Sequence, residues 1–193
     1  MGTALFAARR GFVLAGGRST RMGRDKALLP SGPHTLLEQI AASVREAAGS
    51  VTLIGPPERY AFLGFPVLAD AVESQGPLGG LLTALEATSA DWNLIVACDM
   101  PGLTADFLKS ILAAAELAGK DCLAPVTTRG VEPLCAVYHR RVAAAAKYAL
   151  HHKHLKMQDF LRSIDTAEWP VADSGVLRNV NTPEEWLAGE LKP

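Results

Sequence analysis

The chain alternates short apolar runs with longer stretches in which apolar residues recur every three or four positions. Short apolar runs bounded by turn residues are typical of buried strands, which we expect over residues 11–15, 51–54, 66–69, 93–98, 122–126 and 134–138. The longer spacing is typical of helices, which we expect over residues 36–48, 58–63, 78–87, between 104 and 119, over 142–150 and around 160–161. Alternating strands and helices predict an α/β fold with a mostly parallel sheet covered on both faces.

Several of the expected helices carry their own start and stop signals. Thr35 and Glu38 form a capping box before the first helix, and Gly49 follows its last apolar position. Residues 182–185 place a threonine cap, a proline and two glutamates at the start of a further helix. Since no internal repeat, low-complexity tract or interior linker interrupts the pattern, we expect a single domain over residues 1–193.

Three of the expected strands end in residues that are suited to ligand binding. The first runs into Gly16-Gly17, the third ends at Asp70 and the fourth ends at Asp99. Ligands of open α/β sheets bind beyond the carboxyl ends of the strands, so these positions can converge on one ligand.

The segment after the first strand combines glycines with basic side chains. Gly16 and Gly17 allow a ligand to approach the main chain, whose N–H groups can form a nest for phosphate oxygens. Arg18, Arg21 and Lys26 add positive charge around that nest. Neither the Walker loop nor the G-x-G-x-x-G motif is present, and a plain glycine turn with solvated arginines fits the spacing equally well.

The two aspartates and the second glycine segment also allow two interpretations each. Asp99 could hold Mg²⁺ together with substrate phosphates, or it could cap the turn at Pro101. Asp70 could contact ribose, base or metal, or it could form a turn. The segment 76–80 opens a helix, and its glycines could admit a flat base or simply allow close helix packing.

Other segments give weaker indications. Residues 132–138 could line a pocket for a second substrate, or they could be an ordinary strand after a turn. The basic cluster, His151 to His154 with Lys156, could attract an anion, but such clusters are usually solvated helix ends, and we assign no metal to it. Asn179 and Asn181 could hydrogen-bond a polar ligand, although asparagine is also common in turns.

Composition narrows the class of protein. The formal net charge of −1 over 193 residues gives no indication of a nucleic-acid or membrane surface, and we expect neither partner. Cys98, Cys122 and Cys135 lie in apolar runs without metal-binding spacing, so we expect free, buried thiols in a reducing compartment. No secretory signal or membrane-spanning stretch is apparent, and these features together predict a cytoplasmic protein.

At these residues the sequence resembles the molybdenum cofactor guanylyltransferase family. Residues 14–28 match the family's opening signature, L-A-G-G-x-S-x-R-M-G-x-D-K-A-L, throughout. Four further family segments follow in the family's order: G-P-L-x-G at 76–80, C-D-M-P at 98–101, E-P-L-x-A-x-Y at 132–138 and N-x-N-T-P-E-E at 179–185. The resemblance therefore covers nearly the whole chain.

The resemblance implies a fold and an activity. The fold would be a three-layer α/β sandwich with a mostly parallel, Rossmann-like nucleotide-binding sheet. The enzyme would use Mg²⁺ to transfer GMP from GTP to the terminal phosphate of Mo-molybdopterin, forming molybdopterin guanine dinucleotide and pyrophosphate. Proteins that deliver molybdopterin or assemble molybdoenzymes would be its partners.

Carried over by position, the resemblance also implies a set of site residues. The catalytic residues would be Arg21, Lys26 and Asp99, and Asp99 would also hold the metal. The substrate-binding residues would be Leu14, Ala15, Gly16, Gly17, Lys26, Asp70, Gly76, Gly80, Asp99, Asn179 and Asn181.

One position departs from the family's pattern and leaves open which nucleotide base the enzyme would select. Some members carry an asparagine after the second strand that contacts the nucleotide, whereas this chain has Ile54, which cannot donate a side-chain hydrogen bond.

A related enzyme that uses CTP or a sugar phosphate is the first alternative function, although cytidylyl relatives usually read L-A-A-G where this chain has L-A-G-G. A non-catalytic assembly factor is the second, and the presence of both Lys26 and Asp99 argues against it. The missing G-x-G-x-x-G argues against a dinucleotide-dependent oxidoreductase. The segment before Gly11 is assigned no role.

Overall fold

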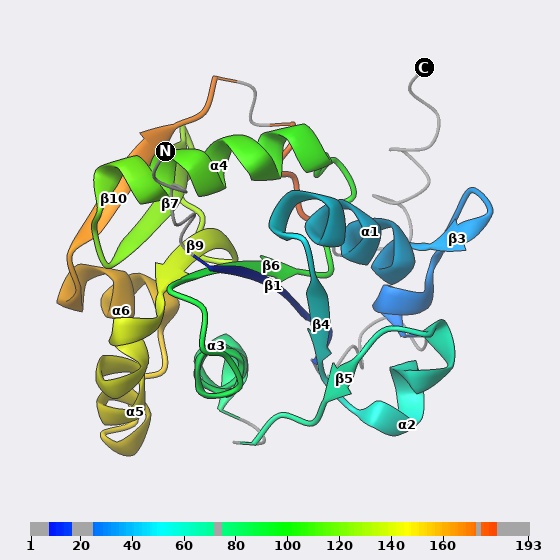
Figure 1. The fold of residues 1–193 in the computed structure, drawn as a ribbon, viewed down its shortest axis with the longest axis horizontal. Coiled ribbons are helices and arrows are strands. Elements are labelled where there is room, and N and C mark those ends of the chain that lie inside the picture. The colour runs from blue at the N-terminus through cyan, green and yellow to red at the C-terminus, as the bar shows by residue number, and fades with distance from the viewer. Residues whose placement is uncertain (1–7, 17–24, 72–74, 173–174, 181–193) are drawn as a thin grey trace, which may run out of the picture.

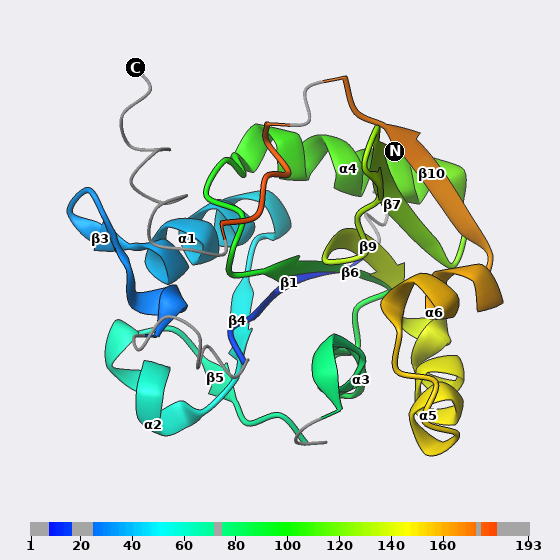
Figure 2. The same cartoon turned by 180° about the vertical axis from the view of Figure 1, so that it is seen from behind.

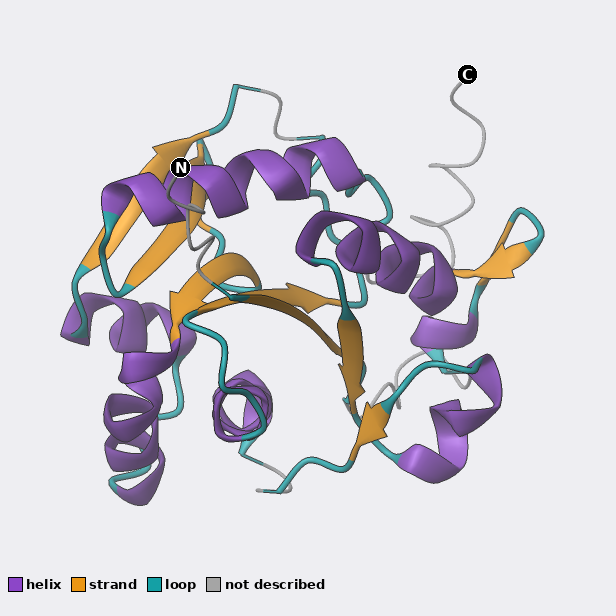
Figure 3. Ribbon diagram, in the orientation of Figure 1, coloured by secondary structure: helices purple, strands orange, loops and turns teal. Residues whose placement is uncertain are grey.

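A twisted sheet of eight strands forms the centre of the molecule in the computed structural model, which describes residues 8–16, 25–71, 75–172 and 175–180 (Figures 1 and 3). The strand order is β10-β7-β9-β6-β1-β4-β5, with β8 paired to β7. The strands are β1 (Arg9–Leu14), β4 (Val51–Ile54), β5 (Val67–Leu68), β6 (Trp92–Ala97), β7 (Cys122–Thr127), β8 (Gly130–Val131), β9 (Cys135–His139) and β10 (Thr166–Pro170). β2 (Pro30–Ser31) and β3 (His34–Thr35) form a separate hairpin.

Most neighbouring strands of the large sheet run parallel, as the alternating pattern predicts. β1 pairs in parallel with both β4 and β6, β4 pairs in parallel with β5, and β7 does so with β10. β9 is antiparallel to both of its neighbours, β6 and β7. The amino end of β9 therefore lies at the same edge of the sheet as the carboxyl end of β6.

Helices cover both faces of the sheet and complete three layers (Figures 1 and 2). α1 (Leu36–Ala48) and α4 (Ala105–Ala118) lie on one face, and α3 (Gly76–Glu86), α5 (Ala143–His151) and α6 (Met157–Ser163) lie on the other. The short α2 (Pro57–Tyr60) lies beside β5, and three 3-10 turns, η1 (Lys26–Leu28), η2 (Ala61–Leu63) and η3 (Arg140–Val142), complete the elements. None of the helices in these ranges is long and apolar enough to cross a membrane.

The side chains of β1 belong alternately to two hydrophobic cores, one on each face of the sheet. Val13 belongs to the core shared with α1 and α4, whereas Phe12 and Leu14 belong to the core shared with α3, α5 and α6. Successive side chains of a strand point to opposite faces, so one strand contributes to both cores. The apolar run at the start of the chain is thus explained by burial on two sides.

The capping signals of α1 act as the sequence predicts. Thr35 Oγ1 accepts a hydrogen bond from Glu38 N, and Thr35 N donates to Glu38 Oε2 at 2.7 Å. Gly49 ends the helix with φ of 77°, a conformation that glycine adopts without steric cost. The predicted range 36–48 is therefore confirmed at both ends.

Some boundaries differ from the predicted ones. The predicted helix over 58–63 is divided into α2 and η2, and the predicted strand over 66–69 is reduced to Val67–Leu68. β8 and β10 were not predicted, because neither contains an apolar run. The predicted helix start at 182–185 lies outside the described residues.

The three cysteines are free thiols. Cys122 and Cys135 are buried, whereas Cys98 is partly exposed as a residue. Burial among core atoms and, next, the negative charge of Asp99 raise the pKa of the Cys98 thiol to about 12. All three thiols therefore stay protonated near neutral pH.

Candidate functional site

The carboxyl ends of β1, β4 and β6 are joined by main-chain hydrogen bonds. Ala15 N donates to Ile54 O at 2.9 Å, and Cys98 N donates to Leu14 O at 3.3 Å. These bonds extend the parallel ladder by one residue past β1 and past β6. Asp99 therefore follows directly after a residue that is bonded to the end of β1, as the strand-end argument predicts.

Lys26 and Asp99 form an ion pair at this edge. Lys26 Nζ lies 3.1 Å from Asp99 Oδ2, and the side chains are 12% and 23% exposed. The second oxygen, Asp99 Oδ1, is buried and has no hydrogen-bond partner within the described residues. A buried carboxylate oxygen without a donor is costly unless a cation or another donor reaches it, so this oxygen is available to such a group.

The backbone that carries Lys26 is held by two side chains. Asp25 caps η1, since its Oδ1 accepts from Ala27 N at 3.1 Å. Tyr60 Oη lies 2.9 Å from Asp25 Oδ2 and 2.9 Å from Ala15 O. Burial of the Tyr60 phenol, and next the nearby Asp25 carboxylate, raises the pKa of Tyr60 well above its usual value, so the hydroxyl keeps its proton.

Glu132 is a carboxylate near this edge that was not among the predicted site residues. It is half-buried in the turn between β8 and β9, and Leu134 N donates to its Oε1 at 3.3 Å. Burial raises the pKa of Glu132, and the negative charge of Asp99 adds to that rise. The segment 132–138 matched a family motif, but only the antiparallel direction of β9 explains why its first residue lies close to Asp99.

The segment 175–180 brings Asn179 to the same place. Val180 N donates to Asp99 O at 2.9 Å, so Asn179 precedes a residue that is bonded to the Asp99 main chain. Asn179 Oδ1 is buried and accepts no hydrogen bond from the described residues. A Cβ on Gly102 would lie 3.2 Å from Gly175 O, so a glycine there lets the segment pack closely on the turn after β6.

Asp70 lies beyond β5 and is linked to α3. Its Oδ1 lies 3.1 Å from Thr83 Oγ1, which also lies 3.0 Å from Gly79 O. Asp70 therefore contacts α3 in the second half of the helix that the second glycine segment opens.

The glycines of α3 have different structural roles. Gly76 has a φ of 66° with open space where a Cβ would be, as expected for a turn that a ligand could approach. Gly80 is buried, and a Cβ there would lie 3.1 Å from Leu14 Cδ2 and 3.7 Å from Ile54 Cγ2. Close packing of α3 on β1 and β4 is thus sufficient to explain Gly80, and the Ile54 side chain belongs to this core.

Some predicted site residues cannot be placed. Gly17, Arg21 and Asn181 lie outside the described residues. Among the predicted residues within the described ranges, the structure brings Ala15, Gly16, Lys26, Asp99 and Asn179 to one edge of the sheet.

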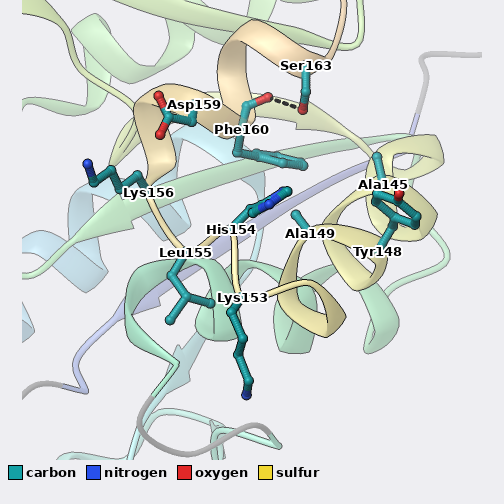
Figure 4. A pocket seen from close by; sticks show the side chains of 10 residues that line it. All are labelled: Ala145, Tyr148, Ala149, Lys153, His154, Leu155, Lys156, Asp159, Phe160 and Ser163. Atoms are coloured by element: carbon teal, nitrogen blue, oxygen red, sulfur yellow. Dashed lines mark hydrogen bonds between the residues drawn. The ribbon is translucent and has the colours of Figure 1, made fainter.

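The basic cluster lies elsewhere, between α5 and α6. Lys153, His154 and Lys156 line a cavity of about 780 Å³ together with the aromatic rings of Tyr148 and Phe160 (Figure 4). None of the cavity's lining residues is among the predicted site residues. Within the described parts of the chain, no three histidine, cysteine or acidic side chains are grouped so that they could hold a metal.

Comparison with known proteins identifies related sequences along almost the whole chain. The family model of the MobA-like NTP transferase domain matches residues 11–168. A probable molybdenum cofactor guanylyltransferase of Synechococcus elongatus is 36% identical over 187 residues, which cover 93% of this chain and 96% of that protein. A probable molybdenum cofactor guanylyltransferase of Carboxydothermus hydrogenoformans is 32% identical over 181 residues, which cover 90% and 91%.

A solved structure shares the fold. The molybdopterin-guanine dinucleotide biosynthesis protein A of Archaeoglobus fulgidus superposes with a TM-score of 0.81 at 22% identity, covering 94% of this chain and 96% of that one. At this identity the likeness supports the three-layer α/β architecture with a mostly parallel sheet.

Proposed function

This chain belongs to the MobA-like NTP transferase family, and from that premise we propose that it is a molybdenum cofactor guanylyltransferase. It transfers GMP from GTP to the terminal phosphate of Mo-molybdopterin, with formation of molybdopterin guanine dinucleotide and release of pyrophosphate. Curated relatives that carry this name and cover nine tenths of the chain support the choice of reaction.

The observation that carries the proposal is the Lys26–Asp99 pair at the ends of β1 and β6. Transfer of a nucleotidyl group requires that the charge of the substrate phosphates be neutralised and that the reacting groups be held in line. Lys26 supplies a positive charge, while Asp99 Oδ1 is available to a cation. This pairing of opposite charges at a ligand-binding edge suits a nucleoside triphosphate.

The proposed cofactor is Mg²⁺, with Asp99 as its protein ligand. The fit rests on the buried Asp99 oxygen that lacks a donor, because Mg²⁺ commonly binds through one or two carboxylates together with substrate phosphates and water. When bound, the ion would polarise the α-phosphate and stabilise charge on the leaving pyrophosphate.

The side chains and main chain of the protein position the two substrates. We assign the phosphates to Lys26 and Arg21 and to the N–H groups of Gly16 and Gly17, where the positive charges share the phosphate charge. We assign the rest of the nucleotide to the strand ends and to the start of α3, through Leu14, Ala15, Asp70, Gly76 and Gly80.

The second substrate is assigned to the other side of Asp99. Asn179 and Asn181 contact molybdopterin, and the buried Asn179 oxygen is available to a donor of that ligand. The attacking phosphate of molybdopterin is already an anion near neutral pH, so no general base is needed, and we assign none.

The proposed base is guanine. The family name of the relatives and the L-A-G-G sequence at residues 14–17 support GTP. Ile54 lies in the core beneath Gly80, so its side chain packs against the helix rather than selecting a base.

The remaining parts of the proposal concern domain organisation, cellular location and partners. One domain carries the activity and acts in the cytoplasm, and its partners are the two substrates together with proteins that deliver molybdopterin or assemble molybdoenzymes. We propose no nucleic-acid or membrane partner.

Turnover with each triphosphate tests the proposed reaction. Pyrophosphate release is measured with Mo-molybdopterin, Mg²⁺ and either GTP or CTP, and we expect release with GTP. Release with CTP alone would identify a cytidylyltransferase, and nucleotide binding without any release would identify a non-catalytic assembly factor.

Replacement of Asp99 by asparagine tests the metal assignment. Asp99→Asn keeps the shape of the side chain but removes its charge, so we expect kcat to fall by roughly 100- to 1,000-fold. Mg²⁺-dependent binding of GTP, measured by calorimetry, should weaken as well. Asp106→Asn is the control, because Asp106 is exposed on α4 and pairs only with Lys109 within the described residues. An Asp99→Asn enzyme with full activity would refute the assignment.

A further inference from the structure

Tyr60 joins two parts of the site that are separated in sequence. Its hydroxyl lies 2.9 Å from Ala15 O, just beyond β1, and 2.9 Å from Asp25 Oδ2, just before η1. A phenol has one proton, and both neighbours are acceptors, so one hydroxyl proton is shared between the two oxygens. Tyr60 itself comes from α2, which belongs to neither part.

Close packing fixes the Tyr60 ring, and therefore the place of its hydroxyl group. Tyr60 is buried, with 1% of its surface exposed. A Cβ on Gly55 would lie 3.1 Å from Tyr60 Cε2, so the ring packs directly against the main chain that follows β4. Arg59, the preceding residue, lies 3.8 Å from Asp25 Oδ2 and adds a positive charge on the same oxygen.

Asp25 transmits this position to Lys26. One carboxylate oxygen of Asp25 reaches Tyr60, and the other accepts from Ala27 N and caps η1. Lys26 is the first residue of η1 and extends its ammonium group to Asp99. The contacts thus run from Tyr60 through Asp25 and the backbone of η1 to the Lys26–Asp99 pair.

We infer that Tyr60 is a positioning residue of the nucleotide site, which sets the place of Lys26 relative to Asp99 and the end of β1. The inference rests on the proposed function, because it assigns Lys26 to the triphosphate. Tyr60 does not touch the reacting atoms. It acts by holding Asp25, and its loss weakens the site for the triphosphate without altering the site for the second substrate.

Tyr60→Phe tests the inference, because it removes the hydroxyl and keeps the ring. We expect KM for GTP to rise by about 10- to 100-fold, because Asp25 Oδ2 and Ala15 O lose their shared donor. KM for molybdopterin should stay within about twofold of its wild-type value. GTP binding with Mg²⁺, measured by calorimetry without molybdopterin, should weaken by the same factor as KM for GTP. A purely structural role would lower the melting temperature and the active fraction and leave both KM values unchanged, and that result would overturn the inference.

A second variant and a control make the test sharper. Asp25→Ser keeps an oxygen that can cap η1 but removes the oxygen that reaches Tyr60. Combined with Tyr60→Phe, it should weaken GTP binding by less than the product of the two single effects, because both variants remove the bond between Tyr60 and Asp25. Additive losses would contradict the inference, and Asp25→Ser decides alone if Tyr60→Phe does not fold. Tyr148→Phe is the matched control, since Tyr148 is 64% exposed on α5, and it should bind GTP like the wild type.

Failure of the inference can be distinguished from failure of the proposed function. A wild-type protein that binds and turns over CTP but not GTP would refute the proposed guanylyl transfer. Tyr60 would then be tested with CTP in the same calorimetric experiment. A wild-type enzyme that is active with GTP, paired with a Tyr60→Phe variant that binds GTP equally well, would refute the positioning role alone.

Discussion

Two glutamates of this protein show how local surroundings shift the pKa of one type of side chain in opposite directions. Glu38 accepts hydrogen bonds from Thr35 N and Oγ1, which lower its pKa. Glu132 is half-buried, and burial raises its pKa, with a further rise from the charge of Asp99. The charged form is therefore favoured by folding at Glu38 and disfavoured at Glu132.

The opposite shifts predict opposite pH dependence of stability. Glu132 has a folded-state pKa above its unfolded value, so its contribution is favourable at low pH and is lost as pH rises through the folded pKa. Glu38 has a lowered pKa, so its contribution is present above the unfolded pKa and is lost as pH falls. Relative to the wild type, Glu132→Gln should gain stability and Glu38→Gln should lose it as pH rises from about 4 to 7.

Thermal unfolding without nucleotide or metal checks this prediction, with both variants and the wild type followed over the same pH series. The two differences in melting temperature should diverge as pH increases. Parallel trends, or a loss of stability of Glu132→Gln at neutral pH, would contradict it.

At the residue scale, sequence reasoning identified Lys26 and Asp99 as separate candidates but not their contact or its supports. Asp99 could be predicted as a candidate because it follows a buried strand, and Lys26 because it belongs to the basic segment after the glycine turn. Tyr60 could not, because its role depends on a helix that packs against two other segments. Glu132 belongs to a segment that was a candidate for a second-substrate pocket, but its approach to Asp99 could not be predicted, because only the direction of β9 brings it to this edge.

Close contact between elements depends on the size of single residues. Gly11 on β1 lies beneath α1, and a Cβ there would be 2.3 Å from Val44 Cγ1 and 2.7 Å from Ser50 O. The backbone oxygen cannot move without displacing the turn that joins α1 to β4. Glycine therefore sets the distance between α1 and the sheet.

Gly11→Ala should destabilise the protein by about 1–3 kcal/mol, because the added methyl group forces the helix and strand apart. The free energy of unfolding in urea measures the effect. Adding Val44→Ala removes one of the two clashes, so the double variant should lose less than the sum of the single losses. Strictly additive losses would mean that Val44 does not limit the space above Gly11.

At the element scale, helices and strands could be predicted where nearby residues alone determine their ends. The range of α1 was predicted at both ends because Thr35, Glu38 and Gly49 determine those ends within a few residues of chain. β10 was not predicted, since it contains Glu168 and Pro170 and becomes a strand only by pairing with β7. Edge strands of this kind depend on a neighbour that is distant in sequence.

The molecule separates two groups of positive charge. Figures 1 and 2 place α5 and α6 at one end of the sheet and α2 and β5 at the other. The basic cluster belongs to the first end, whereas η1 with Lys26 is tied to α2 through Tyr60. Net charge alone could not have revealed this separation.

Neutralising the basic cluster should therefore leave GTP use unchanged. The variant Lys153→Gln with Lys156→Gln should keep KM for GTP within about twofold of the wild-type value at ionic strengths of about 0.1 M and above, because screening there limits the reach of exposed charges to about 10 Å. Lys26→Gln is the contrasting variant, and its KM for GTP should rise. Steady-state kinetics at two ionic strengths measure both, and a clear rise in KM for the double variant would show that the cluster helps to attract the nucleotide.

The bond from Val180 N to Asp99 O has a consequence for the order in which the protein matures. Ribosomes deliver residues from first to last, so β1, β6 and Asp99 emerge long before the segment 175–180. A nascent chain can therefore assemble β1, β4 and β6 while the turn that carries Asp99 still lacks the segment 175–180. The surroundings of Asp99 are thus completed after the central strands that position it, by residues made later in translation.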